Sequence, residues 1–423
     1  MSPRASAVGQ CMRWRLPALV AGGHASAATA RRRVGWGAAE GRRKITAEGV
    51  GASYVQYPFE VEPGMAGRRG QKVSNIFAQH NAGSKFVMLN RPEALNALNT
   101  DMIRDLDRLY GRVQENPLVG LVLLYGGGDK AFCAGGDVRY LAEGGVQAKG
   151  ARAPQMEFFR EEYTLNHTIG TSRIPVVSLL DGITMGGGVG IALPCKYRVA
   201  TENTRFAMPE SGIGLFPDVG GGWHLSRLGG RLGQFLALTG ARLDGAECVW
   251  AGIATHYLPA EKLAEAKARI IEHPDRIGGI LSELAVTPPP ARIEGNAGLI
   301  KKHFASDRFE DILASLEEED SEWAAKELAT LRSKSPQTCK VALRQLADSA
   351  KLDSFADNMR MEYRIASRVL TRPDFAEGVR AVIVDKTHAP EWNPATAEEV
   401  SDELIDSIFA PLPEGEEWTP LQR

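Results

Sequence analysis

From Lys72 onward, short apolar runs alternate with segments that have helical periodicity. Runs such as KFVMLN, LVGLVLLYGGG, IPVVSLLDG and YRVAT predict strands at 85–90, 118–128, 174–182 and 197–201. After Thr100, which can cap a helix, apolar residues recur at spacings of 4, 3 and 4, at Met102, Leu106, Leu109 and Val113. This alternation predicts an α/β domain whose sheets are covered by helices.

The composition sets limits on what the chain can be. It has 423 residues, of which 43% are hydrophobic and 24% charged, and a formal charge of −2. Near neutrality gives no reason to expect nucleic acid or an anionic membrane as a partner. No apolar run approaches the roughly 18 residues of a membrane-spanning helix. The five cysteines form no CxxC pair, which favours free thiols in a reducing compartment.

The N-terminus differs from the rest of the chain. From Met1 to Ala39 it contains arginines but no Asp or Glu, as organelle import sequences do. A disordered basic tail is the alternative interpretation. We therefore exclude residues 1–65 from the predicted fold as a transit peptide and leader.

Composition also divides the chain after the leader into a core, a linker and a C-terminal part. Residues 272–296 are rich in proline and glycine and are the best linker candidate. We expect an α/β core at 72–271 before this stretch. After it, at 297–423, we expect a mostly helical part that packs back on the core, because charged segments there have apolar residues at helical spacing.

Two glycine-rich junctions are candidates for backbone binding sites. In GITMGGGVGIAL (182–193), glycines separate a strand-like run from a helix-like run. Bare N–H groups at such a junction can hold a phosphate or an oxyanion, although a Walker pattern is missing and a tight turn is the alternative. AFCAGGDVRYL (131–141) is a second junction of this kind, so together they could supply the two donors of an oxyanion hole. Cys133, within this second junction, is interpreted as a packing residue.

Candidate acid–base groups follow prolines in RFAMPESGIGLFPDVGGGWHL (205–225). Glu210 and Asp218 lie among apolar residues, which favours raised pKa values, although loop caps facing water are the commoner case for single carboxylates. Upstream, Glu161 and Glu162 are adjacent on a predicted helix, so at most one of them faces a site. The histidines have no metal-ligand spacing, and no metal site is predicted.

Several motifs together resemble the enoyl-CoA hydratase/isomerase (crotonase) superfamily. They are LNRPEALNALNTDM, KAFCAGGD, GITMGGGVG, FAMPESGIGLFPDVGGG, ALTGARLDGAE and the later DFAEGVRAVIVDKTHAPEWNP. The resemblance extends from about residue 85 to 392. It implies a spiral of ββα turns with helical C-terminal elements.

The resemblance also implies roles for particular residues. The N–H groups of Gly136 and Gly187 would hold the thioester carbonyl oxygen, and Ala134 and Asp137 would lie near the adenine of coenzyme A. No metal or organic cofactor is implied, since coenzyme A is part of the substrate.

A missing carboxylate separates two chemistries within the family. Hydratases use two glutamates, and the first corresponds to Gly190 here. The pattern of the thioester hydrolases corresponds instead to Glu162, Gly187, Glu210 and Asp218, all present in this chain. The resemblance thus implies hydrolysis of 3-hydroxyisobutyryl-CoA to 3-hydroxyisobutyrate and CoA in valine catabolism. Glu210 would be base or nucleophile, Asp218 would orient it or handle protons, and Glu162 would bind the substrate 3-hydroxyl.

Other interpretations of the same motifs stay open. Another acyl-CoA hydrolase or isomerase of the family is one, and a non-catalytic component of mitochondrial ribosomes is another. The leader and the resemblance together predict the mitochondrial matrix, a small acyl-CoA substrate and a possible homo-oligomer.

Overall fold

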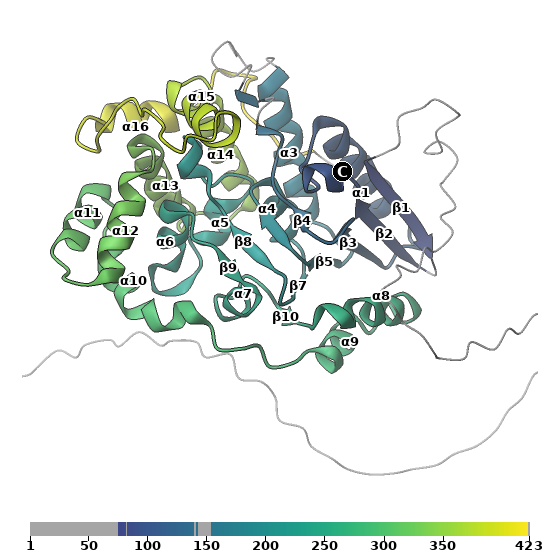
Figure 1. Ribbon diagram of the computed structural model, residues 1–423. Coiled ribbons are helices and arrows are strands. Elements are labelled where there is room, and N and C mark those ends of the chain that lie inside the picture. Colours follow the sequence, from purple (N-terminus) through teal and green to yellow (C-terminus); the bar gives the residue numbers. More distant parts are fainter. Residues whose placement is uncertain (1–74, 82, 139–140, 143–153, 422–423) are drawn as a thin grey trace, which may run out of the picture. The chain divides into compact units, whose positions relative to one another are not determined.

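The computed structural model describes residues 75–81, 83–138, 141–142 and 154–421 (Figure 1). The leader expected at 1–65 lies outside the described residues. Among those that are described, no helix is both long and apolar enough to cross a bilayer.

The larger of two sheets has six strands in the order β1-β2-β3-β5-β7-β10. β1 and β2 pair antiparallel, and every later pair is parallel. The strands predicted from the apolar runs correspond to β2, β3, β5 and β7. The bounds are β1 Ile76–Asn81, β2 Ser84–Leu89, β3 Leu121–Gly126, β5 Val176–Leu180, β7 Tyr197–Ala200 and β10 His256–Tyr257.

The smaller sheet has the order β4-β6-β8-β9, with β8 and β9 antiparallel and the other pairs parallel. Its strands are β4 Ala131–Cys133, β6 Ile183–Met185, β8 Arg205–Ala207 and β9 Leu243–Asp244. Each of β3, β5 and β7 in the large sheet is followed along the chain by β4, β6 or β8 in the small one. This repeating spiral confirms the crotonase-like α/β fold expected from the motifs.

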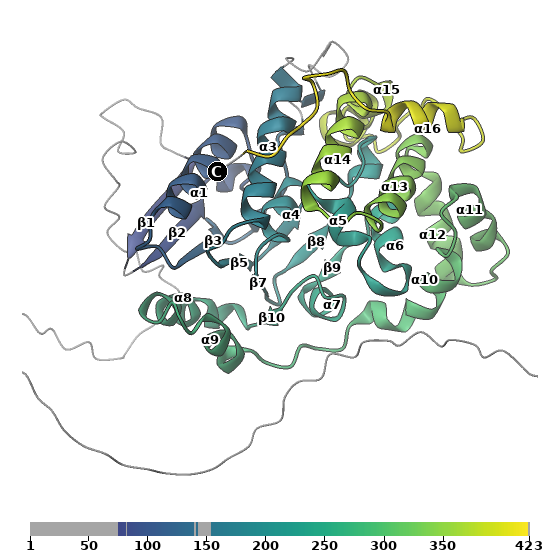
Figure 2. The same ribbon diagram turned by 180° about the vertical axis from the view of Figure 1, so that it is seen from behind.

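Both faces of the large sheet are buried, as alternate side chains of β3 show. Val122 and Leu124 join the main hydrophobic core with α1 (Thr100–Glu115) and α3 (Pro154–Gly170). Leu121 and Leu123 join a second core with α8 (Leu263–Glu272) and α9 (Ile277–Leu284). Figure 2 shows α8 and α9 on the side of the sheet away from α1. Strands buried on both faces read as continuous apolar runs, which explains the pattern of LVLLYG.

Helix α1 has the expected apolar stripe, and Met102, Leu106, Leu109 and Val113 are all buried. Its cap differs from the expectation, because the side chain of Asn99 accepts a hydrogen bond from the Met102 N–H at 2.9 Å. Thr100 is instead the first helical residue. Asn and Thr both serve as N-caps, and the cap position depends on backbone geometry that composition alone does not define.

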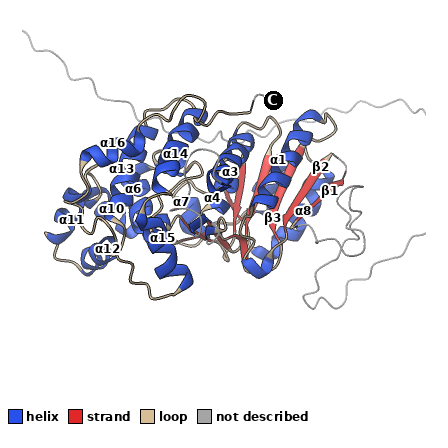
Figure 3. Cartoon of the chain, turned by 90° about the horizontal axis from the view of Figure 1, so that it is seen from above, coloured by secondary structure: helices blue, strands red, loops and turns tan. Residues whose placement is uncertain are grey.

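The C-terminal part is helical and shares the main hydrophobic core with the sheets. Figure 3 shows its helices grouped beside the strands. They are α10 Ala297–His303, α11 Phe309–Glu317, α12 Glu322–Arg332, α13 Pro336–Ser349, α14 Phe355–Val369, α15 Pro373–Val379 and α16 Asp402–Phe409, with a π-helix, η6, at Arg380–Val384. The stretch 272–296, interpreted as a linker, contains α9 and the short 3₁₀ helix η5 Arg292–Asn296.

Short helices lie between the strands along the chain, and one follows the last strand. They are α4 Gly187–Ala192, α5 Gly221–Leu225, α6 Leu232–Thr239 and α7 Gly245–Trp250, with 3₁₀ helices η1 Pro92–Ala94, η2 Glu210–Ile213, η3 Gly229–Arg231 and η4 Ala260–Lys262. The glycine run thus forms the predicted strand-to-helix junction, between β6 and α4.

Candidate active site

A pocket of about 430 Å³ lies where the small sheet meets the C-terminal helices. Its wall combines glycines from two loops, three carboxylates and apolar side chains. The lining includes Ala134, Gly135, Gly136, Val138, Leu141, Phe158, Phe159, Glu162, Met185, Gly186, Gly187, Glu210, Leu215, Asp218, Val219, Lys334, Val382 and Ile383. All the predicted site residues except Asp137 therefore come together here.

The two glycine junctions lie against each other in this pocket. A Cβ atom on Gly187 would lie 3.2 Å from the backbone nitrogen of Gly136, and one on Gly135 would lie 3.9 Å from the nitrogen of Gly187. Gly187 begins α4, so its N–H has no acceptor within the helix. Two backbone amides from distant loops thus lie within reach of a single small group.

Glycine is required at these positions for two reasons. Gly135 has φ +126° and Gly186 has φ +49°, which side chains rarely adopt. A Cβ on Gly187 would also lie only 2.5 Å from Oε1 of Glu162. A larger residue at 187 would therefore force the Glu162 carboxylate to move.

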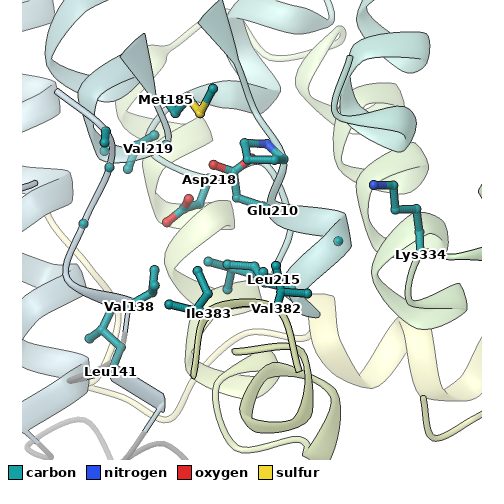
Figure 4. Close-up of a pocket in the computed structure, with 18 of the residues that line it drawn as sticks. Val138, Leu141, Met185, Glu210, Leu215, Asp218, Val219, Lys334, Val382 and Ile383 are labelled. Carbon is teal, nitrogen blue, oxygen red and sulfur yellow. The ribbon is translucent and has the colours of Figure 1, made fainter. Parts of the chain in front are cut away.

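Glu162, Glu210 and Asp218 reach the pocket from different elements. Glu162 comes from α3, Glu210 begins η2, and Asp218 lies in the turn before α5. Their exposed fractions are 2%, 5% and 4%. Figure 4 shows the side chains of Glu210 and Asp218 next to each other in the pocket. Glu161 instead points away from it and forms an ion pair with Arg104, so only one of the adjacent glutamates faces the site.

Hydrogen bonding of these carboxylates is incomplete. Asp218 Oδ2 accepts a hydrogen bond from the hydroxyl of Tyr163 at 2.9 Å. Glu162 Oε1 and Glu210 Oε2 are buried without a hydrogen-bond partner among the described residues. Buried polar atoms in proteins nearly always have a hydrogen-bond partner. The two unpaired oxygens can therefore accept hydrogen bonds from a bound molecule.

Burial raises the pKa of all three carboxyl groups. For Glu162 and Glu210, burial raises the pKa well above the usual range and the nearby Asp218 raises it further. Burial raises the pKa of Asp218 to about 7, although the Tyr163 hydrogen bond acts in the opposite direction. Closely spaced carboxyls of this kind titrate as a group rather than independently.

The turn that carries Asp218 is strained. Val219 has φ +54°, an outlier for a β-branched residue that costs on the order of 1–3 kcal/mol. Its side chain packs against α4, where a Cβ on Gly190 would lie 2.5 Å from Val219 Cβ and 2.9 Å from Asn166 Nδ2. Position 190, where the motif resemblance implies a glutamate in hydratases, therefore has no space for a side chain.

The CoA-related predictions, Ala134 and Asp137, separate in the structure. Ala134 lines the main pocket, whereas Asp137 forms an ion pair with Arg91 at 3.3 Å. Asp137 lines a neighbouring hollow of about 240 Å³ together with Asn99, Thr100, Asp101 and Phe158. Phe158 belongs to both cavities, so the hollow adjoins the main pocket.

Cys133 is buried just beneath the pocket. Burial raises the pKa of its thiol to about 12. It is therefore a protonated packing residue rather than a nucleophile. In the described part of the chain, no group of three His, Cys, Asp or Glu side chains is arranged to hold a metal ion.

Several residues that line the pocket or bond its carboxylates were missed from the sequence. Tyr163 directly follows Glu162, but nothing in the local pattern indicates that it bonds a residue 55 positions later. Val382 and Ile383 lie on the π-helix η6, a type of helix often found at functional sites. Lys334 precedes α13, and burial lowers its pKa. Val382 and Ile383 fall within the family-like stretch DFAEGVRAVIVDKTHAPEWNP, but nothing in it indicates that they line a pocket. The proximity of all these residues to the site arises from packing between distant segments.

The arrangement combines a backbone donor pair with a buried acid–base group. Such donors stabilise negative charge that develops on a carbonyl oxygen, and removing one typically costs roughly 3–4 kcal/mol in acyl transfer. A carboxylate beside them can take a proton from water or attack the carbonyl. The geometry thus suits chemistry at an activated carbonyl group.

Comparison with known proteins agrees with the fold. A model of the enoyl-CoA hydratase/isomerase family matches residues 84–409. The chain is 44% identical to the mitochondrial 3-hydroxyisobutyryl-CoA hydrolase of Xenopus tropicalis, over 77% of this chain and 86% of that protein. For the enzyme of the same name from Gallus gallus the identity is 41%, over 80% and 89%.

A solved structure of similar sequence also has this fold. The crystal structure of a carnitinyl-CoA dehydratase from Mycobacterium thermoresistibile superposes with a TM-score of 0.76 at 36% identity, over 82% of this chain and 98% of that one. The match of the family model over most of the chain, together with these relatives, shows that the chain belongs to the enoyl-CoA hydratase/isomerase family.

Proposed function

We propose that this protein hydrolyses the thioester of 3-hydroxyisobutyryl-CoA to 3-hydroxyisobutyrate and CoA, a step of valine catabolism. The observation that carries the proposal is the pairing of two bare amides with a buried Glu210, while Val219 fills the space at Gly190. The names of the relatives from Xenopus tropicalis and Gallus gallus support the same substrate. Hydration through two glutamates finds no support, because one of the two positions cannot hold a side chain.

In the proposed mechanism, the N–H groups of Gly136 and Gly187 donate to the carbonyl oxygen of the thioester. Glu210 either removes a proton from the attacking water or attacks the carbonyl carbon itself to form an anhydride that water then opens. Both routes pass through a tetrahedral oxyanion held by the amides. The carbon–sulfur bond then breaks, and the CoA sulfur takes up a proton.

Asp218 and Glu162 have supporting roles in this proposal. The raised pKa of Asp218 suits a group that receives and returns a proton near neutral pH. The unpaired Oε1 of Glu162 can accept a hydrogen bond from the 3-hydroxyl of the acyl group. A site that bonds a substrate hydroxyl discriminates strongly against acyl groups without one.

Coenzyme A would extend from the pocket past Phe158 into the adjoining hollow. Two observations support this path: Phe158 lines both cavities, and the hollow contains the polar side chains of Asn99 and Asp137. Ala134 and Asp137 would then lie beside the nucleotide part.

We also propose that the protein acts in the mitochondrial matrix after removal of an import leader within residues 1–65. The acid-free, arginine-containing start of the sequence supports this location. The relatives are themselves named as mitochondrial proteins.

The test is release of the CoA thiol by purified protein from a panel of short acyl-CoA thioesters. We expect rapid release from 3-hydroxyisobutyryl-CoA and much slower release from isobutyryl-CoA, which lacks the hydroxyl. A parallel assay follows loss of enoyl absorbance with methacrylyl-CoA, which reports hydration. Loss of enoyl absorbance without thiol release from any substrate would overturn the proposal.

A further inference from the structure

The turn that carries Asp218 is held by a buried carboxylate from a distant helix. Glu362 lies on α14 and is fully buried. Its Oε2 accepts a hydrogen bond from the Gly220 N–H at 2.7 Å, and its Oε1 accepts one from the Gly222 N–H at 3.0 Å. One side chain thus binds the backbone on the C-terminal side of Asp218 at two points.

A second side chain holds the other side of the same turn. Nε2 of Gln345 on α13 donates to the carbonyl oxygen of Pro217 at 2.8 Å and to Oε1 of Glu362 at 2.9 Å. Nδ2 of Asn358 donates to the same carboxylate oxygen at 2.9 Å. The residues immediately before and after Asp218 and Val219 are therefore fixed through one buried network.

The network requires a carboxylate and close packing. All four partners of Glu362 are N–H donors, so only an acceptor with several lone pairs satisfies them together. A Cβ on Gly222 would lie 2.5 Å from Ser349 Oγ and 2.8 Å from Gln345 Nε2. The α5 backbone thus approaches α13 as closely as glycine allows.

We propose that Glu362 is a positioning residue, which sets the place of Asp218 in the pocket and holds Val219 in its strained conformation over Gly190. This inference rests on the proposed role of Asp218. It gives the C-terminal helices a part in the reaction, although Glu362 itself does not line the pocket. The network has to offset the unfavourable backbone of Val219, because the left-handed conformation persists only where surrounding contacts impose it.

The test compares Glu362→Gln with Glu247→Gln as a matched control. Glu247 is also buried and also accepts two backbone N–H bonds, from Asp244 and Ile293, but it does not line the pocket. We expect Glu362→Gln to lower kcat by about 10- to 100-fold with KM changed less than about threefold, since displacement of a catalytic group by about 1 Å can cost 10²-fold. Glu247→Gln should leave kcat within about twofold.

Hydrogen exchange of the peptide covering 217–225 supplies a readout that does not need turnover. Glu362→Gln should speed exchange there, whereas Glu247→Gln should not. Should Glu362→Gln fail to fold, Gln345→Ala, which keeps the carboxylate, is expected to lower kcat by a smaller factor in the same direction.

Three results would overturn the inference: unchanged exchange in folded Glu362→Gln, unchanged kcat in that variant or in Gln345→Ala, or an equal loss of kcat in Glu247→Gln. If the wild-type protein releases no thiol at all, the proposed function fails, and the exchange measurement alone still decides whether Glu362 holds the turn.

Discussion

The hydroxyl of Tyr163 donates a hydrogen bond to Oδ2 of Asp218, with 2.9 Å between the two oxygens. The bond joins α3 to the turn before α5. Burial raises the pKa of Asp218 to about 7, and the Tyr163 bond opposes that rise because it favours the ionised form. The Tyr163 hydroxyl therefore keeps the pKa of Asp218 lower than burial alone would make it.

Replacement of Tyr163 by Phe should move the pH dependence of the reaction. We expect the acid limb of kcat/KM in the wild type near pH 7 or above, because the working carboxylates must lose protons that burial retains. Tyr163→Phe should shift that limb to higher pH, since the pKa of Asp218 rises without the bond. Thiol release measured between pH 5 and 9 checks this. Tyr363→Phe is the control, because the Tyr363 hydroxyl accepts from Arg160 rather than bonding Asp218. A limb near pH 4 would contradict the expectation.

The raised pKa of Asp218 predicts that the stability of the protein falls over the pH range in which its activity rises. Between the unfolded pKa of Asp218, 3.8, and its folded value of about 7, the native state binds more protons than the unfolded state. The contribution of this group to the free energy of unfolding is thus full below pH 4 and is lost as the pH rises through about 7.

Asp218→Asn should therefore stabilise the protein at pH 8, by an amount on the order of a few kcal/mol, and much less at pH 4. Urea unfolding at the two pH values measures the difference. Equal effects at both pH values would count against a buried, ionised Asp218.

Glu210→Gln should abolish most of the activity and leave the fold intact. General acid–base catalysis typically contributes about 10²- to 10⁴-fold, so kcat should fall within or beyond that range. Gln matches the size of Glu and removes only the charge, so the affinity for CoA measured by calorimetry should stay within about threefold. Turnover close to that of the wild type would remove Glu210 from its proposed role.

Gly187→Ala tests the donor pair directly. The new Cβ would meet Oε1 of Glu162 at 2.5 Å and the Gly136 nitrogen at 3.2 Å, so both the carboxylate and the donors must move apart. We expect kcat to fall by about 10²- to 10³-fold, as on loss of an oxyanion donor. Gly298→Ala is the control, since a Cβ there meets nothing within 4 Å. Comparable losses in the two variants would show that the effect is not specific to the pocket.

Local sequence pattern was enough to predict the strands β2, β3, β5 and β7 and the apolar stripe of α1. It also indicated which residues have the chemistry for the site, because bare glycines and proline-flanked carboxylates are features of short stretches. The motif resemblance then assigned Glu162, Glu210, Asp218, Gly136 and Gly187 to one pocket, and these residues do lie around one cavity.

Tertiary structure decided what surrounds them. Tyr163 meets Asp218 across 55 residues, and Glu362 meets Gly220 across 142. The packing of Val219 against Gly190 likewise depends on a turn held from α13 and α14. Periodicity and spacing describe interactions within a helix or strand, whereas burial, pKa shifts and backbone strain depend on which distant segments exclude water together. The residues of the proposed site could therefore be identified from the sequence, but the environment that tunes them forms only when the C-terminal helices pack on the core.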